Sequence, residues 1–204
     1  MRDWVIAFLG NPGDRYAATR HNLGWWVADG IAAKAKAKFR PGLGDYLLAE
    51  CRVAGRKAHL LKPTTYMNGS GLALDQYARW AGLVPGELIA VADDIALPLG
   101  EVRIRARGSS GGHNGLASII EHLGSDEFTR VRCGVGPVPP GVDAAEFVLD
   151  DFTQDELLPA RQMADRAMLA VEMILARGVS AAANTYNRKP PATEAESPSP
   201  PDAQ

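Results

Sequence analysis

The stretch WVIAFLGNPG, residues 4–13, is the part of the chain that indicates its fold most clearly. Its first six residues are apolar and lead into turn-forming residues, which predicts a short buried strand. Thr19, Arg20, His21 and Asn22 follow soon afterwards, at the start of a predicted helix. A strand that ends in glycines and is followed by a histidine at the start of a helix is typical of α/β enzymes, which hold polar side chains over the edge of the sheet.

The composition is that of an ordinary soluble globular protein. The chain has 204 residues, 46% hydrophobic and 23% charged, which suits one domain with a substantial core. The formal charge of −2 comes from the last sixteen residues, so the body is neutral, which argues against a general nucleic-acid coat protein. Cys51 and Cys133 match no metal or redox spacing and are expected to be reduced core thiols. With no membrane-length apolar run and no signal-peptide flanks, we predict a cytoplasmic protein.

Strands and helices alternate along the chain, which predicts the α/β class. Strands are expected at residues 4–9, 46–53, 57–61, 88–92, 101–107 and 130–135, and helices at 22–38, 64–81, 116–123, 154–177 and 180–187. Pro159 is expected to disturb the long helix early. Gly69 and Gly71 inside a helix cost about 1 kcal/mol each relative to alanine and indicate a close backbone approach. Residues 189–204 are rich in proline and lack aromatics, so we predict a domain over 1–188 and a disordered tail.

His21 and Asp93 are the first candidates for chemistry. His21 lies at a loop-to-helix junction, a poor place for a histidine that only fills a core. Asp93 follows a buried strand, so its carboxylate should lie at the sheet edge, although turn formation or helix capping explains it equally well. If the two meet, the carboxylate can orient the imidazole while the other ring nitrogen takes a proton from water. No nucleophile accompanies the pair, which indicates direct attack by water.

Asn11, Asn68 and Asn114 each lie in a glycine-rich context. Taken singly, each can be a turn former that satisfies its own backbone. An amide offers a donor and an acceptor without titrating, so three of them around a cavity suit a neutral polar substrate. They can also polarise a carbonyl oxygen.

Alternating arginines mark two predicted strands. Arg103, Arg105 and Arg107 share one face of the first, and Arg130 and Arg132 share one face of the second. Such a patch can contact phosphates, with an affinity that falls as salt rises and with little sequence discrimination. The alternative is a solvated sheet edge whose charges prevent aggregation.

Four motifs together resemble the bacterial peptidyl-tRNA hydrolases. They are GNPG at 10–13 with Tyr16, TRHNLG at 19–24, KPTTYMN at 62–68 with Ser70 and Gly71, and GGHNGL at 111–116. The similarity runs in order and spacing from about residue 4 to residue 187. It implies a single α/β domain with a twisted mixed β-sheet surrounded by helices. It also implies hydrolysis of the ester between peptide and tRNA, which recycles tRNA after premature ribosomal drop-off. No metal or cofactor is implied, and we expect a monomer.

The resemblance also assigns roles. His21 would be the general base and Asp93 its orienting partner, while Asn114 would steer the water or the developing oxyanion. Asn11 and Asn68 would position the peptide and the terminal nucleotide. The other expected contacts to substrate or tRNA are Tyr16, Tyr66, Met67, His113, Arg103, Arg105 and Arg132, with Arg105 at a position where the family grips tRNA.

The chain departs from the family pattern beside Asp93. Where the family commonly shows His-Asp-Asp/Glu-Leu-Asp-Leu-Pro, this chain has ADDIALP at 92–98, so Ala92 and Ala96 replace a histidine and an aspartate. The loop at 138–143 also lacks a lysine that members often place near the tRNA acceptor stem. These changes affect the rim of the cleft and the expected affinity more than the central chemistry.

Two other functions fit parts of the sequence. Residues 108–112 satisfy G-x-S-x-G, the nucleophile elbow of serine esterases, with Ser110 as nucleophile. An elbow turns straight into its helix, whereas three residues intervene here. Relatives of the resembled family also serve as RNA-binding splicing factors in plant chloroplasts, without catalysis. A binding module needs no general base, so the presence of both His21 and Asp93 favours the enzyme.

Overall fold

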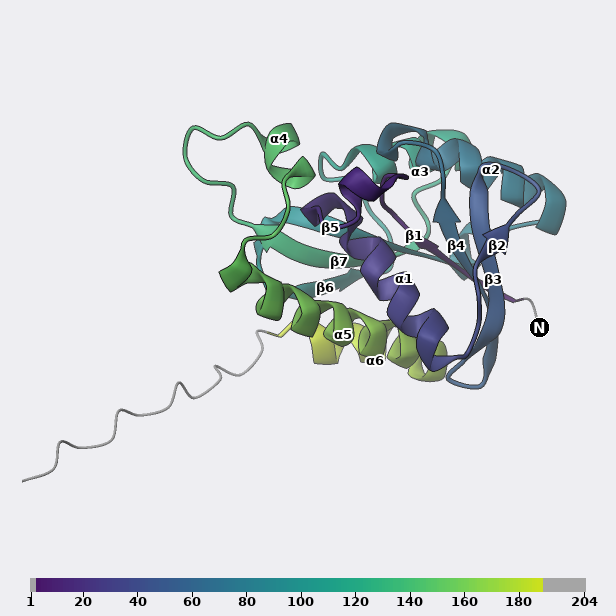
Figure 1. The fold of residues 1–204 in the computed structure, drawn as a ribbon. Helices are drawn as coiled ribbons and strands as arrows, with labels where there is room; N and C mark the ends of the chain where they lie inside the picture. The colour runs from purple at the N-terminus through teal and green to yellow at the C-terminus, as the bar shows by residue number, and fades with distance from the viewer. Residues whose placement is uncertain (1–2, 189–204) are drawn as a thin grey trace, which may run out of the picture.

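A seven-stranded mixed β-sheet forms the centre of this computed structural model, which describes residues 3–188 (Figure 1). Its strands are β1 (Trp4–Phe8), β2 (Arg40–Pro41), β3 (Tyr46–Val53), β4 (Arg56–Pro63), β5 (Leu88–Pro98), β6 (Val102–Arg105) and β7 (Thr129–Gly136). The spatial order is β2-β3-β4-β1-β5-β7-β6. The four strands β4, β1, β5 and β7 are parallel, and the others pair antiparallel at the two edges. The predicted α/β fold with a mixed sheet is confirmed.

Helices cover both faces of the sheet (Figure 1). They are α1 (Leu23–Lys34), α2 (Ser70–Ala81), α3 (Asn114–Leu123), α4 (Ala144–Leu149), α5 (Gln154–Arg177) and α6 (Val179–Tyr186). One core contains residues of α1, α5 and α6, and the other contains residues of α2 and α3. The short helix α4 projects from one edge of this three-layered arrangement.

The apolar run of β1 is explained by these two cores. Ile6 and Phe8 pack into the core under α1 and α5, whereas Val5, Ala7 and Leu9 pack into the core under α2 and α3. A strand that is buried on both faces has no polar side to show, so its sequence is continuously apolar. β1 consequently lies inside the sheet, between β4 and β5.

Several element boundaries differ from the sequence prediction. β5 does not end at Ala92 but continues to Pro98, because it pairs with β7 as far as Asp94 and again at Pro98. α2 begins at Ser70, after a 3₁₀ turn at Met67–Gly69, rather than at residue 64. α1 ends at Lys34, and the segment up to residue 38 is not helical.

One further expectation about the helices is wrong, and one helix was not anticipated. α5 is continuous through Pro159, although this proline is the sixth residue of the helix and so removes the hydrogen bond that an N–H there would donate to the carbonyl of Asp155. α4 was not expected at all. Within residues 3–188, no helix is long and apolar enough to cross a membrane. The tail expected at 189–204 lies outside the described residues.

Gly71 marks the close approach of α2 to α3 that its position inside a helix predicted. A Cβ there would lie 2.0 Å from the carbonyl oxygen of Ser118. We expect Gly71→Ala to lower the free energy of unfolding by about 1–3 kcal/mol in urea, because the added methyl must push α3 away. Gly86→Ala is the control, since a Cβ at Gly86 meets no atom within 4 Å. Equal stabilities of the two variants would contradict the assigned close approach.

Candidate active site

A cleft of about 460 Å³ opens beyond the carboxyl ends of β1 and β4 and beside the middle of β5, at Asp93, Asp94 and Ile95. This is the edge at which open α/β sheets hold their ligands. Ten of the residues singled out from the sequence line it: Asn11, Tyr16, His21, Tyr66, Met67, Asn68, Asp93, His113, Asn114 and Arg132. Segments far apart in the chain thus meet at one place. Arg103 and Arg105 do not line the cleft and lie on the edge strand β6.

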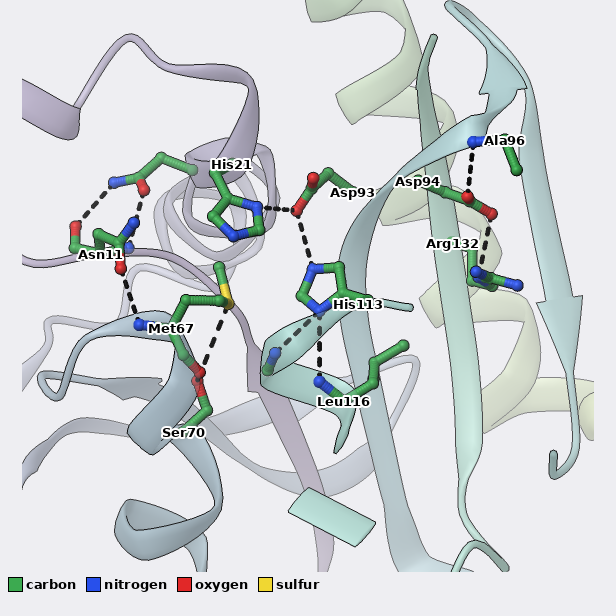
Figure 2. Close-up of polar contacts among 12 residues, drawn as sticks. Asn11, His21, Met67, Ser70, Asp93, Asp94, Ala96, His113, Leu116 and Arg132 are labelled. Atoms are coloured by element: carbon green, nitrogen blue, oxygen red, sulfur yellow. Dashed lines mark hydrogen bonds and ion pairs between the residues drawn. The ribbon is translucent and has the colours of Figure 1, made fainter. Parts of the chain in front are cut away.

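His21 and Asp93 form a buried pair (Figure 2). His21 lies in the 3₁₀ turn Arg20–Asn22 that leads into α1, and Asp93 lies on β5. The Nδ1 of His21 is 2.8 Å from Oδ1 of Asp93, and the two residues are 8% and 2% exposed. This contact orients the ring. The other ring nitrogen, Nε2, has no hydrogen-bond partner among the described residues and can accept a proton in the cleft.

His113 contacts the same carboxylate from the other side. Its Nε2 lies 3.0 Å from Oδ1 of Asp93. Its Nδ1 accepts hydrogen bonds from the backbone amides of Gly115 and Leu116 at 3.1 and 3.2 Å, at the start of α3. Because Nδ1 acts as an acceptor, the ring proton lies on Nε2. A neutral His113 therefore donates to Asp93.

The two imidazoles keep Asp93 ionised. Burial alone would raise the pKa of Asp93, but the interactions with His21 and His113 outweigh it and hold this pKa well below its usual range. An ionised carboxylate beside Nδ1 stabilises the imidazolium that forms when His21 takes a proton. The pair therefore has the electrostatics that a general base requires.

His21, Asp93 and His113 also lie close enough to suggest a metal site, with one ligand atom of each within 4.8 Å of the others. A metal-bound histidine normally donates its second ring N–H to an acceptor. The second nitrogen of His113 instead accepts two backbone amide protons. A metal on Nε2 would leave this ring with no proton at all. The three side chains are therefore arranged for hydrogen bonding rather than for a cation.

Asn11 is held by its neighbours on both the backbone and the side chain. The Asn22 side chain accepts from the backbone N–H of Asn11 at 2.8 Å and donates to the backbone carbonyl of Asn11 at 2.9 Å. Oδ1 of Asn11 accepts from the amide of Met67 at 2.8 Å. This leaves the side-chain NH₂ of Asn11 as the group available to a ligand. Asn22 was missed as a site residue, although it stands beside His21 in the motif and is 1% exposed.

Asn68 and Asn114 are exposed on the cleft lining. Asn68 lies in the turn before α2, and Asn114 is the first residue of α3. In the described part of the chain neither side chain has a hydrogen-bond partner, so they are not turn formers that satisfy their own backbone. Tyr16 and Tyr66 also line the cleft and pack edge to face, with 6.3 Å between ring centroids.

Arg132 is the only arginine of the expected patch that reaches the cleft. It lies opposite Arg103 in the β6–β7 register, and its Nε is 3.0 Å from Oδ2 of Asp94. Arg103 is 3.7 Å from Glu101. Arg105 is exposed and has no carboxylate within ion-pair distance among residues 3–188. Of the arginines on β6, Arg105 is therefore the one most available to an anion.

The expected patch is wrong at two positions. Arg130 is 2% exposed, and its guanidinium donates to the backbone carbonyls of Asp126, Phe128 and Gly108, so it stabilises a turn instead of facing solvent. Arg107 lies beyond the end of β6 and pairs with Glu127 at 2.9 Å. The alternating arginines predicted which face of the sheet these side chains lie on, but not the carbonyls and the carboxylate that they contact.

An apolar wall of the cleft was also missed. It is formed by one side of α4 together with Ile95, and its residues on α4 are Ala144, Ala145, Val148 and Leu149. A signal for this helix is present in the sequence. Asp143 is followed three residues later by Glu146, and Oδ1 of Asp143 accepts from the amide of Glu146 at 3.1 Å as a helix cap.

Ser110 does not belong to this cleft. It lines a separate depression together with Ser109, Glu121 and Asp126, whereas His21 and Asp93 line the main cleft. The G-x-S-x-G match therefore has neither base nor carboxylate of the pair beside its serine. A serine-esterase mechanism at this position has no structural basis.

Comparisons with known proteins agree with these observations. The family model described as peptidyl-tRNA hydrolase matches residues 5–194. A peptidyl-tRNA hydrolase of Chloroflexus aurantiacus is 45% identical over 185 residues, which cover 90% of this chain and 98% of the relative. A second one, of Desulfitobacterium hafniense, is 42% identical over 184 residues, which cover 90% of this chain and 99% of the relative.

Solved structures give the same result. The crystal structure of a peptidyl-tRNA hydrolase in complex with N-propanol superposes with a TM-score of 0.85 at 31% identity, covering 93% of this chain and 97% of the other. The Acinetobacter baumannii peptidyl-tRNA hydrolase gives 0.84 at 30% identity, covering 91% and 94%. The 5′-methylthioadenosine nucleosidase of Arabidopsis thaliana, at 10% identity and a TM-score of 0.54, shares the fold alone. With the family model, the relatives and the solved structures in agreement, this chain belongs to the peptidyl-tRNA hydrolase family.

Proposed function

We propose that this protein hydrolyses the ester bond between peptide and tRNA in peptidyl-tRNA and so returns free tRNA to translation. The observation that carries the proposal is the 2.8 Å contact between His21 and Asp93 inside the cleft. Membership of the family supports the substrate, since the relatives bear the name of this activity. The apolar and amide-lined cleft suits a neutral acyl group.

His21 acts as the general base. Its Nε2 takes a proton from water as the water oxygen bonds to the ester carbonyl carbon. The tetrahedral intermediate then collapses, the bond to the 3′ oxygen of the terminal ribose breaks, and this oxygen takes the proton from the imidazolium. Asp93 stabilises the imidazolium between the two steps. No covalent acyl-enzyme is required, because no serine, cysteine or threonine of the described residues 3–188 lines the cleft beside the base.

The three asparagines position the reactants. The free NH₂ of Asn11 is a donor for the peptide, and Asn68 on the turn before α2 is available to the terminal nucleotide. The side-chain amide of Asn114, on the first turn of α3 beside His113, has no hydrogen-bond partner among residues 3–188. It orients the water or donates to the developing oxyanion, an interaction that is worth about 10²–10³-fold in rate at comparable sites.

Arg105 binds a phosphate of the tRNA, and Arg103 and Arg132 add positive charge nearby. We expect Arg105→Ala to raise KM for peptidyl-tRNA and to lower the slope of log affinity against log salt by about 1, because one phosphate contact is lost. Titrations at several salt concentrations measure this slope. Arg107→Ala is the control, since Arg107 is paired with Glu127. An unchanged slope for Arg105→Ala would remove it from the tRNA contact.

The proposal places the protein in the cytoplasm, where ribosomes produce peptidyl-tRNA, and as a monomer. One chain supplies both the base and the carboxylate as well as all three asparagines of the cleft. A second subunit is therefore not needed to complete the site.

The test is release of N-acetyl-aminoacyl groups from tRNA by the purified protein, with and without EDTA. We expect rapid release that chelation leaves unchanged, because the donors around Asp93 fit hydrogen bonds and not a metal. Loss of activity in EDTA, restored by a divalent cation, would contradict the mechanism. A folded protein that binds tRNA without cleaving the ester would indicate an RNA-binding relative instead.

A further inference from the structure

Arg20, the residue before the general base, is buried with 5% of its surface exposed and reaches toward the end of α4. Its Nη1 lies 3.3, 3.2 and 3.0 Å from the backbone carbonyl oxygens of Phe147, Asp150 and Asp151. Carbonyls at the end of a helix have no partner within the helix. One guanidinium thus donates to the last turn of α4 and to the segment that follows it.

The other side of the same guanidinium is also fixed. Nη2 lies 2.6 Å from Oε2 of Glu156, which in turn accepts from the amide of Thr153 in the capping box of α5. The guanidinium stacks over the ring of Phe147 at 4.3 Å and lies 5.4 Å from the ring centroid of Phe152. Backbone carbonyls, the carboxylate of Glu156 and two aromatic rings therefore fix the position of the Arg20 guanidinium.

Backbone contacts join the same two segments. The amide of Arg20 donates to the carbonyl of Asp150 at 3.1 Å, and Thr19 forms an isolated β-bridge with Asp151. Among the described elements, the main packing partner of α4 is the turn Arg20–Asn22. The helix that forms the apolar wall of the cleft is thus tied to the protein chiefly beside Arg20.

We propose that Arg20 is a positioning residue that holds the apolar wall of α4 at a fixed place across from His21 and thereby sets the affinity for substrate. The proposal deepens the proposed function and rests on it for its kinetic consequence. His21 is held separately by Asp93, so the chemical step depends little on Arg20. Loss of the Arg20 contacts should therefore raise KM and leave kcat nearly unchanged.

The first test does not depend on activity. Arg20→Lys keeps the charge but cannot reproduce the fork, in which Nη1 reaches the carbonyls beside α4 while Nη2 reaches Glu156. Hydrogen exchange followed by mass spectrometry should show faster exchange over residues 144–152 in this variant. Arg166→Lys is the matched control, because Arg166 also donates to backbone carbonyls, but those of Tyr186 and Arg188 at the end of α6 rather than those beside α4. Unchanged exchange over 144–152 in Arg20→Lys would overturn the proposal.

The second test is kinetic. We expect KM for N-acetyl-aminoacyl-tRNA to rise about tenfold in Arg20→Lys, with no such rise in Arg166→Lys. Leu149→Ala removes part of the apolar wall and should also raise KM. If Arg20 acts through this wall, the double variant Arg20→Lys/Leu149→Ala is less impaired than the product of the two single effects. Increases in KM that multiply in the double variant, or a fall in kcat without a rise in KM, would contradict the positioning role.

Glu156→Gln covers the case in which Arg20→Lys does not fold. The glutamine can still accept from the Thr153 amide but no longer pairs as an anion with Arg20. The same faster exchange and higher KM are expected, at a smaller size, and their absence would count against the proposal. If the wild type cleaves no peptidyl-tRNA, the proposed function fails, while the exchange experiment still decides whether Arg20 anchors α4.

Discussion

Replacing His21 by alanine is expected to lower kcat for peptidyl-tRNA hydrolysis by about 10²–10⁴-fold, the usual contribution of a general base. The variant keeps Asp93 and the cleft asparagines but has no group that can take the proton of the attacking water. Because His21 lies in a short turn whose neighbour Arg20 is anchored independently, the fold should persist. Single-turnover release at saturating protein measures the chemical step directly.

The control for this variant is His122→Ala. His122 lies on α3, where its Nδ1 contacts the carbonyl of Ser118, and it does not line the cleft. Its loss should leave kcat unchanged. Turnover like that of the wild type in His21→Ala would remove His21 from the mechanism, whatever the value for His122→Ala.

Asp93→Asn is expected to lower kcat by a similar factor, about 10²–10⁴-fold, with little change in KM. An asparagine has the same shape but no charge, so it cannot stabilise the imidazolium of His21. Both histidines contact the same oxygen, Oδ1, so an asparagine oxygen at that place can still accept from them, and the variant removes the charge rather than the hydrogen bonds. Steady-state kinetics give kcat and KM, and an equal loss in both kcat and binding would contradict the orienting role.

The same variant makes a prediction about stability. The folded-state pKa of Asp93 is held below its usual value, so the charge contributes stability above the ordinary carboxyl pKa of about 3.9, and this contribution is lost as pH falls through the folded-state value. The advantage of the wild type over Asp93→Asn should be full at neutral pH and shrink in acid. Urea unfolding over a pH series measures it, and an advantage that grows in acid would be contrary to this account.

The sequence could predict the parts of the fold that depend on local pattern. The doubly buried β1 and the position of His21 just before the first helix follow from apolar runs and turn residues. The length of β5 could not be predicted, because the polar residues Asp93 and Asp94 indicated that the strand ends there. Both are buried, and their partners His113 and Arg132 come from distant segments. Only the assembled sheet brings these charges together.

Arg130 and α4 are two further features that the sequence could not predict. The alternation in β7 placed Arg130 on the correct face, but no local pattern shows that a turn at Asp126 to Phe128 offers carbonyls to cover it. α4 has a recognisable cap at Asp143, yet six residues give too little periodicity to be read as a helix. Its position depends on Arg20, more than a hundred residues earlier in the chain.

The departures from the family pattern leave the central pair intact. Ala92 is buried in the core under α2 and α3. Ala96 is exposed, and its amide donates to Oδ1 of Asp94 at 3.0 Å. Neither residue lines the cleft. The two alanines therefore change the surroundings of β5 rather than the His21 and Asp93 contact.

The double variant His21→Ala/Asp93→Asn tests the central claim most directly, because the two residues are proposed to act as one unit in ester hydrolysis. Single-turnover release of N-acetyl-aminoacyl groups from tRNA should be strong for the wild type. The double variant should then be no more than about threefold slower than His21→Ala alone, since effects within a catalytic unit do not add. Losses that multiply in the double variant would show that Asp93 acts independently of His21 and would contradict the mechanism.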